Sequence, residues 1–409
     1  MKRTAAVGFL LALASAARAS SPEMPVIRIS VDLVQVDAVV TDGKGRHVTD
    51  LRPEDFTLEE GGKRQRITNV VYVRAGASRT DPSAVEAGAS EPVSAGGRTL
   101  IFVVDDLGMS LESMVAARRA LNRFAEQPFA RGDRVALLRT GQDESSFTFM
   151  PSREAFAKAT AELRHNLQSG RGATSMLPAS SSPLDARALT PGSYTQMLFR
   201  RRVAFLLGTI DGQRSLPGRK ALVLLSEGFS VGTRRPHEIG IASAFESIYG
   251  DSDIQAALRM LTDMANRAAV VTYAIDPRGL ESDFPTAADR LDLRSGPPTS
   301  QMDLMRARHS ARFDSQGTLQ ELADRTGGLT VLNRNDLVGG LAEILDDQRG
   351  YYLVGYEPAA ATFEKSSGKP RFHKVKVGVT RPGLKVRSRA GFYGISDEEV
   401  AKKAPAPVL

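Results

Sequence analysis

Acidic and hydroxyl side chains follow one apolar run of the sequence, Thr99 to Val104. Asp105 and Asp106 come directly after this run, and Ser110 lies a few positions further on. Asp106 and Ser110 are spaced as the ends of an Asp-x-Ser-x-Ser loop, whose carboxylate and hydroxyl oxygens suit a hard cation such as Mg²⁺. Gly108 stands at the middle position and offers no ligand. The alternative is that the two aspartates cap the next helix or accept hydrogen bonds from loop amides.

Other patterns that indicate catalysis are missing from the sequence. The 5 histidines are far apart and show no zinc-hydrolase spacing. Ser226 is not the nucleophile of a Gly-x-Ser-x-Gly turn, because Leu224 occupies the first glycine position. Asp276 follows another apolar run, where it is either a further carboxylate near the cation or the opening of an Asp-Pro turn, and the turn is favoured.

Short apolar runs alternate with helical patterns across the middle of the chain. Runs such as Ala221–Leu225 are apolar throughout, which indicates strands buried on both faces of a parallel sheet. We therefore predict a doubly wound, mostly parallel α/β fold of Rossmann-like type, which binds ligands at the carboxyl ends of its strands. The predicted strands are 99–104, 135–139, 146–150, 220–225, 269–275 and 329–332, and the predicted helices are 111–127, 153–165, 196–210, 253–267, 318–326 and 337–348.

Residues on either side of this α/β region have the alternating pattern of β-strands. The N-terminal zone predicts a long strand ending near Val40, a turn at 41–45, and a hairpin that joins 56–62 to 67–73. The C-terminal zone predicts a strand at 351–356 and a hairpin that joins 373–379 to 384–387. We expect the two zones to pair with each other in a small β-sandwich-like module.

The chain divides into segments of different composition. Three polar stretches, 169–192, 232–250 and 277–312, are predicted to be surface insertions. The predicted organisation is a signal peptide 1–19, an N-terminal β segment 20–75, a linker 76–97, an α/β domain 98–349, a C-terminal β segment 350–394 and a tail 395–409.

The N-terminus has the features of a secretory signal peptide. Lys2 and Arg3 precede an apolar run, and Ala17-Arg18-Ala19 supplies small residues for cleavage. This predicts export to the periplasm or the extracellular space, with no membrane span after Ser20. Removing residues 1–19 takes away three basic residues and leaves +4 of the formal net charge of +7. That mild excess, without an aromatic stacking platform, argues against a nucleic-acid partner. The absence of Cys excludes disulfides and thiolate metal sites.

The order of these phrases resembles a known family. The α/β region resembles a von Willebrand factor type A (VWA) domain, and the chain from about Ile27 to Tyr393 resembles the VWFA-related acidobacterial family. The phrases that carry the resemblance are 99–106 with Ser110, then 218–228, 322–328 and 351–356.

The resemblance implies a metal-ion-dependent adhesion site (MIDAS). Matched position by position, its ligands are Asp106, Ser110, Thr174 and Glu227, and its ion is Mg²⁺, Mn²⁺ or Ca²⁺. Glu227 stands where the family has Asp, so the site is a weakened one. The implied function is an exported module for protein–protein interaction or adhesion, with a protein partner and no catalytic residues. Two alternatives stay open: an exported metal-dependent hydrolase that uses Asp105, Asp106 and Glu227, and a metal-free scaffold.

Overall fold

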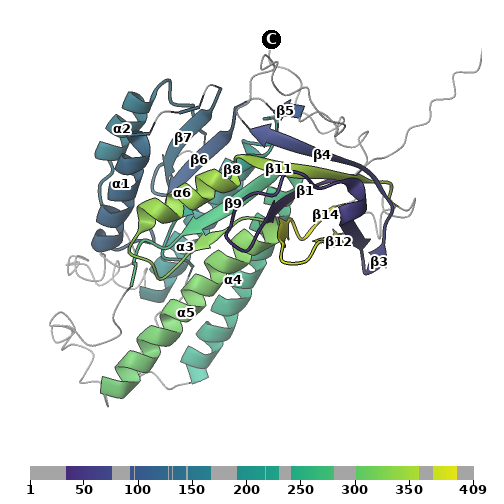
Figure 1. Cartoon of the computed structure of the whole chain (residues 1–409). Helices are drawn as coiled ribbons and strands as arrows, with labels where there is room; N and C mark the ends of the chain where they lie inside the picture. The colour runs from purple at the N-terminus through teal and green to yellow at the C-terminus, as the bar shows by residue number, and fades with distance from the viewer. Residues whose placement is uncertain are drawn as a thin grey trace, which may run out of the picture. The chain divides into compact units, whose positions relative to one another are not determined.

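A parallel sheet of five strands forms the centre of the chain (Figure 1). The computed structural model describes residues 34–75, 93–95, 97–127, 129–130, 132–143, 146–166, 191–216, 218–229, 241–280, 301–358 and 372–393. The predicted signal peptide, most of the predicted linker and the predicted tail lie outside these ranges. The strands, in spatial order, are β10 (Thr330–Val331), β9 (Val270–Ile275), β8 (Lys220–Leu225), β6 (Thr99–Val104) and β7 (Arg134–Arg139).

Helices cover both faces of this sheet. The side chains of its central strands are apolar on both faces, so each face packs against its own layer of helices. Leu100, Phe102 and Val104 of β6 belong to one core cluster, while Ile101 and Val103 belong to the other. The first cluster is covered by α1 (Leu111–Ala125), α2 (Arg153–Ala161) and α6 (Leu337–Asp347). The second is covered by α3 (Pro191–Asp211), α4 (Ile241–Arg267) and α5 (Gln301–Thr326). The predicted doubly wound α/β architecture is confirmed at this level.

Two further sheets, both largely antiparallel, come from the N- and C-terminal segments. The first contains β13 (Lys385–Ser388), β1 (Val34–Thr41), β11 (Gly350–Tyr356), β4 (Ile67–Ala75) and β5 (Val93–Ala95) in that order. The second contains β14 (Gly391–Tyr393), β12 (Phe372–Val379), β2 (Phe56–Glu60) and β3 (Lys63–Arg64). Side chains of both sheets, among them Val36, Leu58, Tyr352 and Val377, share one core. The prediction that the two zones pair is confirmed.

Both predicted hairpins between long strands are wrong. Strand β2 pairs with β12 and β3, whereas β4 leaves for the other sheet and pairs with β11. Strands β12 and β13 likewise belong to different sheets, since β13 pairs with β1. Alternation predicted the strands, but it carries no information about which neighbour completes their hydrogen bonds. The turn at 41–45 is confirmed by the bridge between Thr41 and His47.

Several predicted boundaries also need correction. The α4 and α5 helices begin at Ile241 and Gln301, inside two of the stretches predicted to be insertions. Residues 146–150 form no strand, although the Met150 amide donates to the Val135 carbonyl over 2.7 Å. The predicted linker contains β5, which pairs with β4 in parallel. Among the described helices, none combines the length and the apolar character that a bilayer-spanning segment requires.

The two edges of the parallel sheet have different neighbours. All of its strands run the same way, so their carboxyl ends share one edge. Leu33–Leu409 form one compact unit. Within it, strands of the antiparallel sheets contact helices at the opposite, amino edge of the parallel sheet. There, Arg387 of β13 pairs with Asp347 at the end of α6, and the Ala390 amide donates to the Arg325 carbonyl over 3.1 Å.

Candidate binding site at the carboxyl edge of the parallel sheet

The chain changes direction across the sheet between β6 and β8. From β6 it continues to β7 on one side, and it later returns to β8 on the other side. Helix α1 after β6 and helix α4 after β8 therefore cover opposite faces. This is the position at which open α/β sheets leave a crevice for ligands. Asp105, Asp106, Ser226 and Glu227 all follow these two strands, so they lie at the crevice.

A buried arginine fills the centre of this crevice. Arg202 of α3 donates from Nε to Asp105 Oδ1 over 2.8 Å, and its Nη2 contacts Asp105 Oδ2. The same Nη2 donates to the Gly228 carbonyl over 2.7 Å. Ser226 Oγ completes the shell by donating to Asp105 Oδ2 over 2.6 Å. The guanidinium thus binds the ends of β6 and β8 together, and it lies over the Phe229 ring at 4.8 Å.

Sequence reasoning missed Arg202, although a signal was present. The core-facing stripe of α3 contains Leu198, Phe199, Val203, Leu206 and Ile210, all of them buried. Their spacing follows the helical period, and position 202 falls inside the same stripe. A basic residue in an apolar stripe needs a buried partner of opposite charge. A single sequence does not say which acidic residue that partner is.

Gly108 provides the space that the guanidinium occupies. A Cβ atom at this position would lie 2.5 Å from Arg202 Cζ and 2.6 Å from Asp105 Oδ2. Those separations are far below van der Waals contact. The glycine was interpreted above as a missing ligand, and the structure shows a steric reason for it.

Asp106 points to the other side, toward the loop after β7. Its Oδ1 accepts hydrogen bonds from the Gly141 amide over 2.6 Å and from the Thr140 hydroxyl over 3.1 Å. The Thr140 hydroxyl also lies 3.0 Å from Asp105 Oδ1, so it bridges the two carboxylates. Burial raises the pKa of Asp106, and the Gly141 and Thr140 hydrogen bonds oppose that rise. Thr140 was not among the predicted residues.

Ser110 and Glu227 contact each other at the start of α1. Glu227 Oε1 accepts a hydrogen bond from the Ser110 amide over 2.8 Å. Ser110 Oγ in turn accepts from the Ser113 amide over 3.3 Å and caps the helix. A carboxylate at a helix N-terminus is favoured by the exposed amides and the helix dipole. Glu227 is only 2% exposed, so this contact joins the end of β8 to α1 within the protein.

Asp276 forms the predicted turn after β9. Its Oδ1 accepts from the Arg278 amide over 3.1 Å, and its Oδ2 pairs with the Arg278 guanidinium at 2.7 Å. Arg278 Nη2 also donates to the Glu227 carbonyl over 3.1 Å. A second buried arginine therefore connects the ends of β8 and β9.

The described contacts link two of the four predicted metal ligands to each other. Ser110 contacts Glu227, whereas Asp106 contacts the loop after β7, and Thr174 lies outside the described residues. No group of three or more His, Asp and Glu side chains suited to a metal ion occurs among the described residues. The donors also fit a direct-coordinated cation poorly, because the Arg202 charge stands next to the middle position of the loop. The four-residue metal set stays a prediction.

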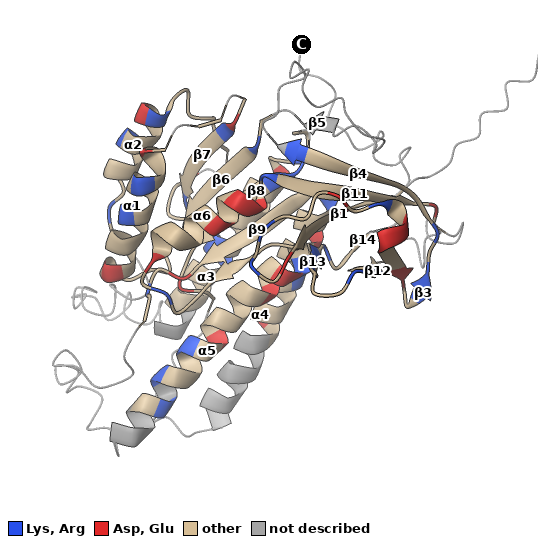
Figure 2. Cartoon of the chain, viewed as in Figure 1, with Lys and Arg blue, Asp and Glu red and all other residues tan. Residues whose placement is uncertain are grey.

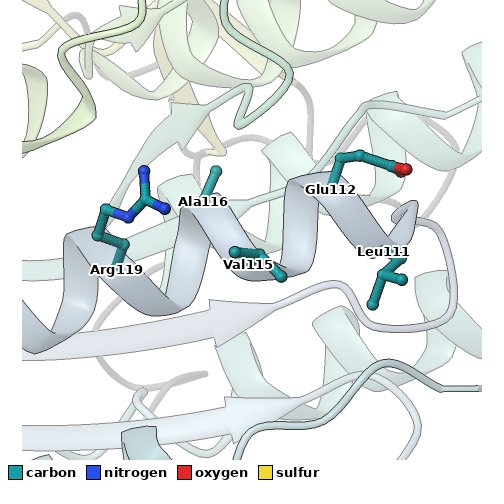
Figure 3. Close-up of a pocket in the computed structure, with 5 residues that line it drawn as sticks. All are labelled: Leu111, Glu112, Val115, Ala116 and Arg119. Atoms are coloured by element: carbon teal, nitrogen blue, oxygen red, sulfur yellow. The ribbon is translucent and has the colours of Figure 1, made fainter.

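Helix α1, which begins at this edge, carries a depression lined in part by apolar side chains. Leu111 and Val115 of α1 line a shallow depression of about 370 Å³ with Glu112, Ala116 and Arg119 (Figure 3). Figure 2 shows basic and acidic segments interspersed along the described elements, and no single basic face dominates that view.

Comparisons with known proteins assign no family to this chain. No family model matches it, and no curated protein matches it. Among solved structures, a mutant of the PilB minor pilin from Streptococcus sanguinis is 10% identical and aligns over 72% of this chain and 89% of that chain, with a TM-score of 0.23. A similarity that low assigns neither a common fold nor a function.

Proposed function

We propose that the protein is an exported, non-enzymatic interaction module whose α/β domain is of the VWA type. In this proposal a protein partner docks on the carboxyl edge of the parallel sheet. The doubly wound sheet, the acidic loop after β6 and the crevice between β6 and β8 support the VWA assignment. No described contact favours hydrolysis, because Asp105 is already neutralised by Arg202.

The distribution of exposed apolar side chains carries the proposal. Leu111 is 56% exposed, Leu280 is 69% exposed and Val338 is 37% exposed. These residues follow the ends of β6, β9 and β10, so they come from three different segments of one edge. Single exposed apolar residues are ordinary on protein surfaces, but their recurrence at one edge is typical of an interaction site.

The amino edge is engaged in contacts within the chain. Arg387 pairs there with Asp347, and Arg389 donates to the Asn266 carbonyl over 3.3 Å. These contacts join the antiparallel sheets to the α/β domain. We therefore assign the binding of a partner to the carboxyl edge.

Site-specific photo-crosslinking tests the docking surface. A photoreactive residue is placed at Leu111, at Leu280 and, as a matched control, at Met260 on α4, which is 50% exposed. Each variant is produced in the native cell, and the exported fraction is irradiated. We expect protein adducts at Leu111 and Leu280, and none at Met260. Leu280→Asp should then prevent the adduct at Leu111, while Met260→Asp should not.

The same preparations test export. Terminal sequencing of the recovered protein should begin near Ser20, since cleavage after Ala19 is predicted. Adducts of equal strength at all three positions, or none at either edge residue, would contradict the docking surface. A full-length protein retained in the cytoplasm would contradict export.

A further inference from the structure

Buried carboxylates at the carboxyl edge create a requirement for positive charge. Each of these four carboxylates is at most 2% exposed, and an isolated buried carboxylate is strongly unfavourable. Two guanidinium groups supply positive charge: Arg202 pairs with Asp105, and Arg278 pairs with Asp276. The carboxylates are Asp105, Asp106, Glu227 and Asp276.

Arg202 has the connectivity of a bound cation. It contacts oxygen atoms that follow two strands, namely the carboxylate of Asp105, the hydroxyl of Ser226 and the carbonyl of Gly228. A guanidinium offers several fixed N–H donors and keeps its charge, so it satisfies such a group of oxygens without a metal. With its side chain 7% exposed, Arg202 is not available to pair with a partner.

We infer that Arg202 is a built-in replacement for a divalent cation at the carboxyl edge. Gly108 belongs to the same arrangement, because a side chain at position 108 and the guanidinium exclude each other. The edge accordingly needs no divalent cation to hold its shape, and its described residues leave no open coordination position for a carboxylate of a partner. This inference concerns the interior of the edge and stands whether or not the proposed docking surface is correct.

A double-mutant cycle tests the exclusion between position 108 and Arg202. Gly108→Ala should lower the melting temperature by several degrees, because the added Cβ meets the guanidinium. Arg202→Ala removes the guanidinium and frees the Asp105 carboxylate from its pair, so the same glycine substitution should cost clearly less in the Arg202→Ala background. The φ of Gly108 lies outside the left-handed region, so the backbone itself accepts alanine. Gly43→Ala is the matched control, since nothing lies within 4 Å of its added Cβ, and its effect should be the same in both backgrounds.

The unmodified protein tests the cation directly, which covers the case in which Arg202→Ala does not fold. Its melting temperature should be equal in EDTA and in millimolar Mg²⁺ or Mn²⁺, and calorimetric titration with either ion should show no binding. Independent, additive effects of the two substitutions would overturn the inference. So would stabilisation by Mg²⁺ that disappears in Asp106→Ala, because that result would establish the predicted metal site. Neither result depends on whether a partner is captured.

Discussion

The two edges of the parallel sheet each bury an arginine against an aspartate. At the carboxyl edge Arg202 pairs with Asp105, and at the amino edge Arg219 lies 3.6 Å from Asp347. Both carboxylates have side chains that are 1% exposed. Each guanidinium also lies over an aromatic ring, that of Phe229 at 4.8 Å and that of Tyr351 at 5.4 Å.

The two pairs differ in what else neutralises the aspartate. Asp347 also contacts the Arg387 guanidinium and accepts a hydrogen bond from the Tyr273 hydroxyl over 2.5 Å. Asp105 has Arg202 as its cation, and its remaining described partners are hydroxyl groups. The amino-edge pair is thus part of a joint between the α/β domain and strand β13. The carboxyl-edge pair closes a crevice with a single cation.

This difference predicts unequal losses when each arginine is replaced by methionine. Arg202→Met leaves Asp105 buried without a cation, so we expect a loss of roughly 3–5 kcal/mol in the free energy of unfolding. Arg219→Met should cost less, because Asp347 keeps Arg387. In addition, Nε and Nη1 of Arg219 have no hydrogen-bond acceptor among the described residues, so the substitution removes a cost of burial. Urea unfolding monitored by circular dichroism measures both values.

A second pair of variants checks the reason for the difference. Asp105→Asn in the Arg202→Met background should recover part of the loss, because the uncompensated charge is gone. An Arg219 variant that is at least as unstable as the Arg202 variant would contradict the assignment of Arg387 as the second cation of Asp347.

Features that depend on local patterns were predicted from the sequence, whereas features that depend on contacts between distant residues were not. Strands β6 and β8 were predicted at their observed bounds, because burial on both faces produces an uninterrupted apolar run. The hairpins were wrong because pairing between β4 and β11 joins residues far apart in the sequence. The first turns of α4 and α5 were missed because the stretches that contain them were interpreted as insertions, although Ile241, Phe245 and Ile248 of α4 repeat at helical spacing.

The site was predicted in part for a similar reason. Asp106, Ser110 and Glu227 lie at the predicted edge, since the carboxyl ends of parallel strands share one edge. The partner of Asp105 was missed because Arg202 is distant in the sequence and belongs to a helix rather than to a loop. Gly108 was interpreted only as a missing ligand, because its steric role becomes visible when Arg202 is placed beside it.

Lys220 gives the amino edge a pH dependence in the alkaline range. Burial lowers the pKa of Lys220 to about 8 from the ordinary value of 10.5. Between these values the unfolded chain binds the proton and the folded chain does not, so the stability due to this group rises with pH through that window. Lys220→Met should remove this rise. It should also increase the free energy of unfolding at pH 7 by roughly 1–2 kcal/mol, because the cost of burying the ammonium group exceeds the value of its hydrogen bond to the Leu216 carbonyl.

Unfolding midpoints at pH 7, 8, 9 and 10 measure this slope. The comparison is between the variant and the unmodified protein at each pH, so that the titration of buried tyrosines affects both equally. Parallel curves for the two proteins would show that the Lys220 ammonium is not desolvated in the folded state.

Asp106 gives the smallest expected effect and separates it from its neighbour Asp105. Because burial raises the pKa of Asp106, its contribution to stability is fully present below the ordinary value of 3.8 and is lost as pH rises through the folded pKa. Asp106→Asn keeps an oxygen acceptor for the Gly141 amide, so the free energy of unfolding at pH 7 should change by no more than about 1 kcal/mol. The variant should also lose the decline in stability just above pH 3.8, whereas Asp105→Asn should be strongly destabilised at pH 7 because Arg202 loses its counter-charge. Acid titrations of both variants, followed by tyrosine fluorescence, distinguish the two carboxylates. Equal losses in both would show that Asp106 also depends on a cation, as a metal ligand would.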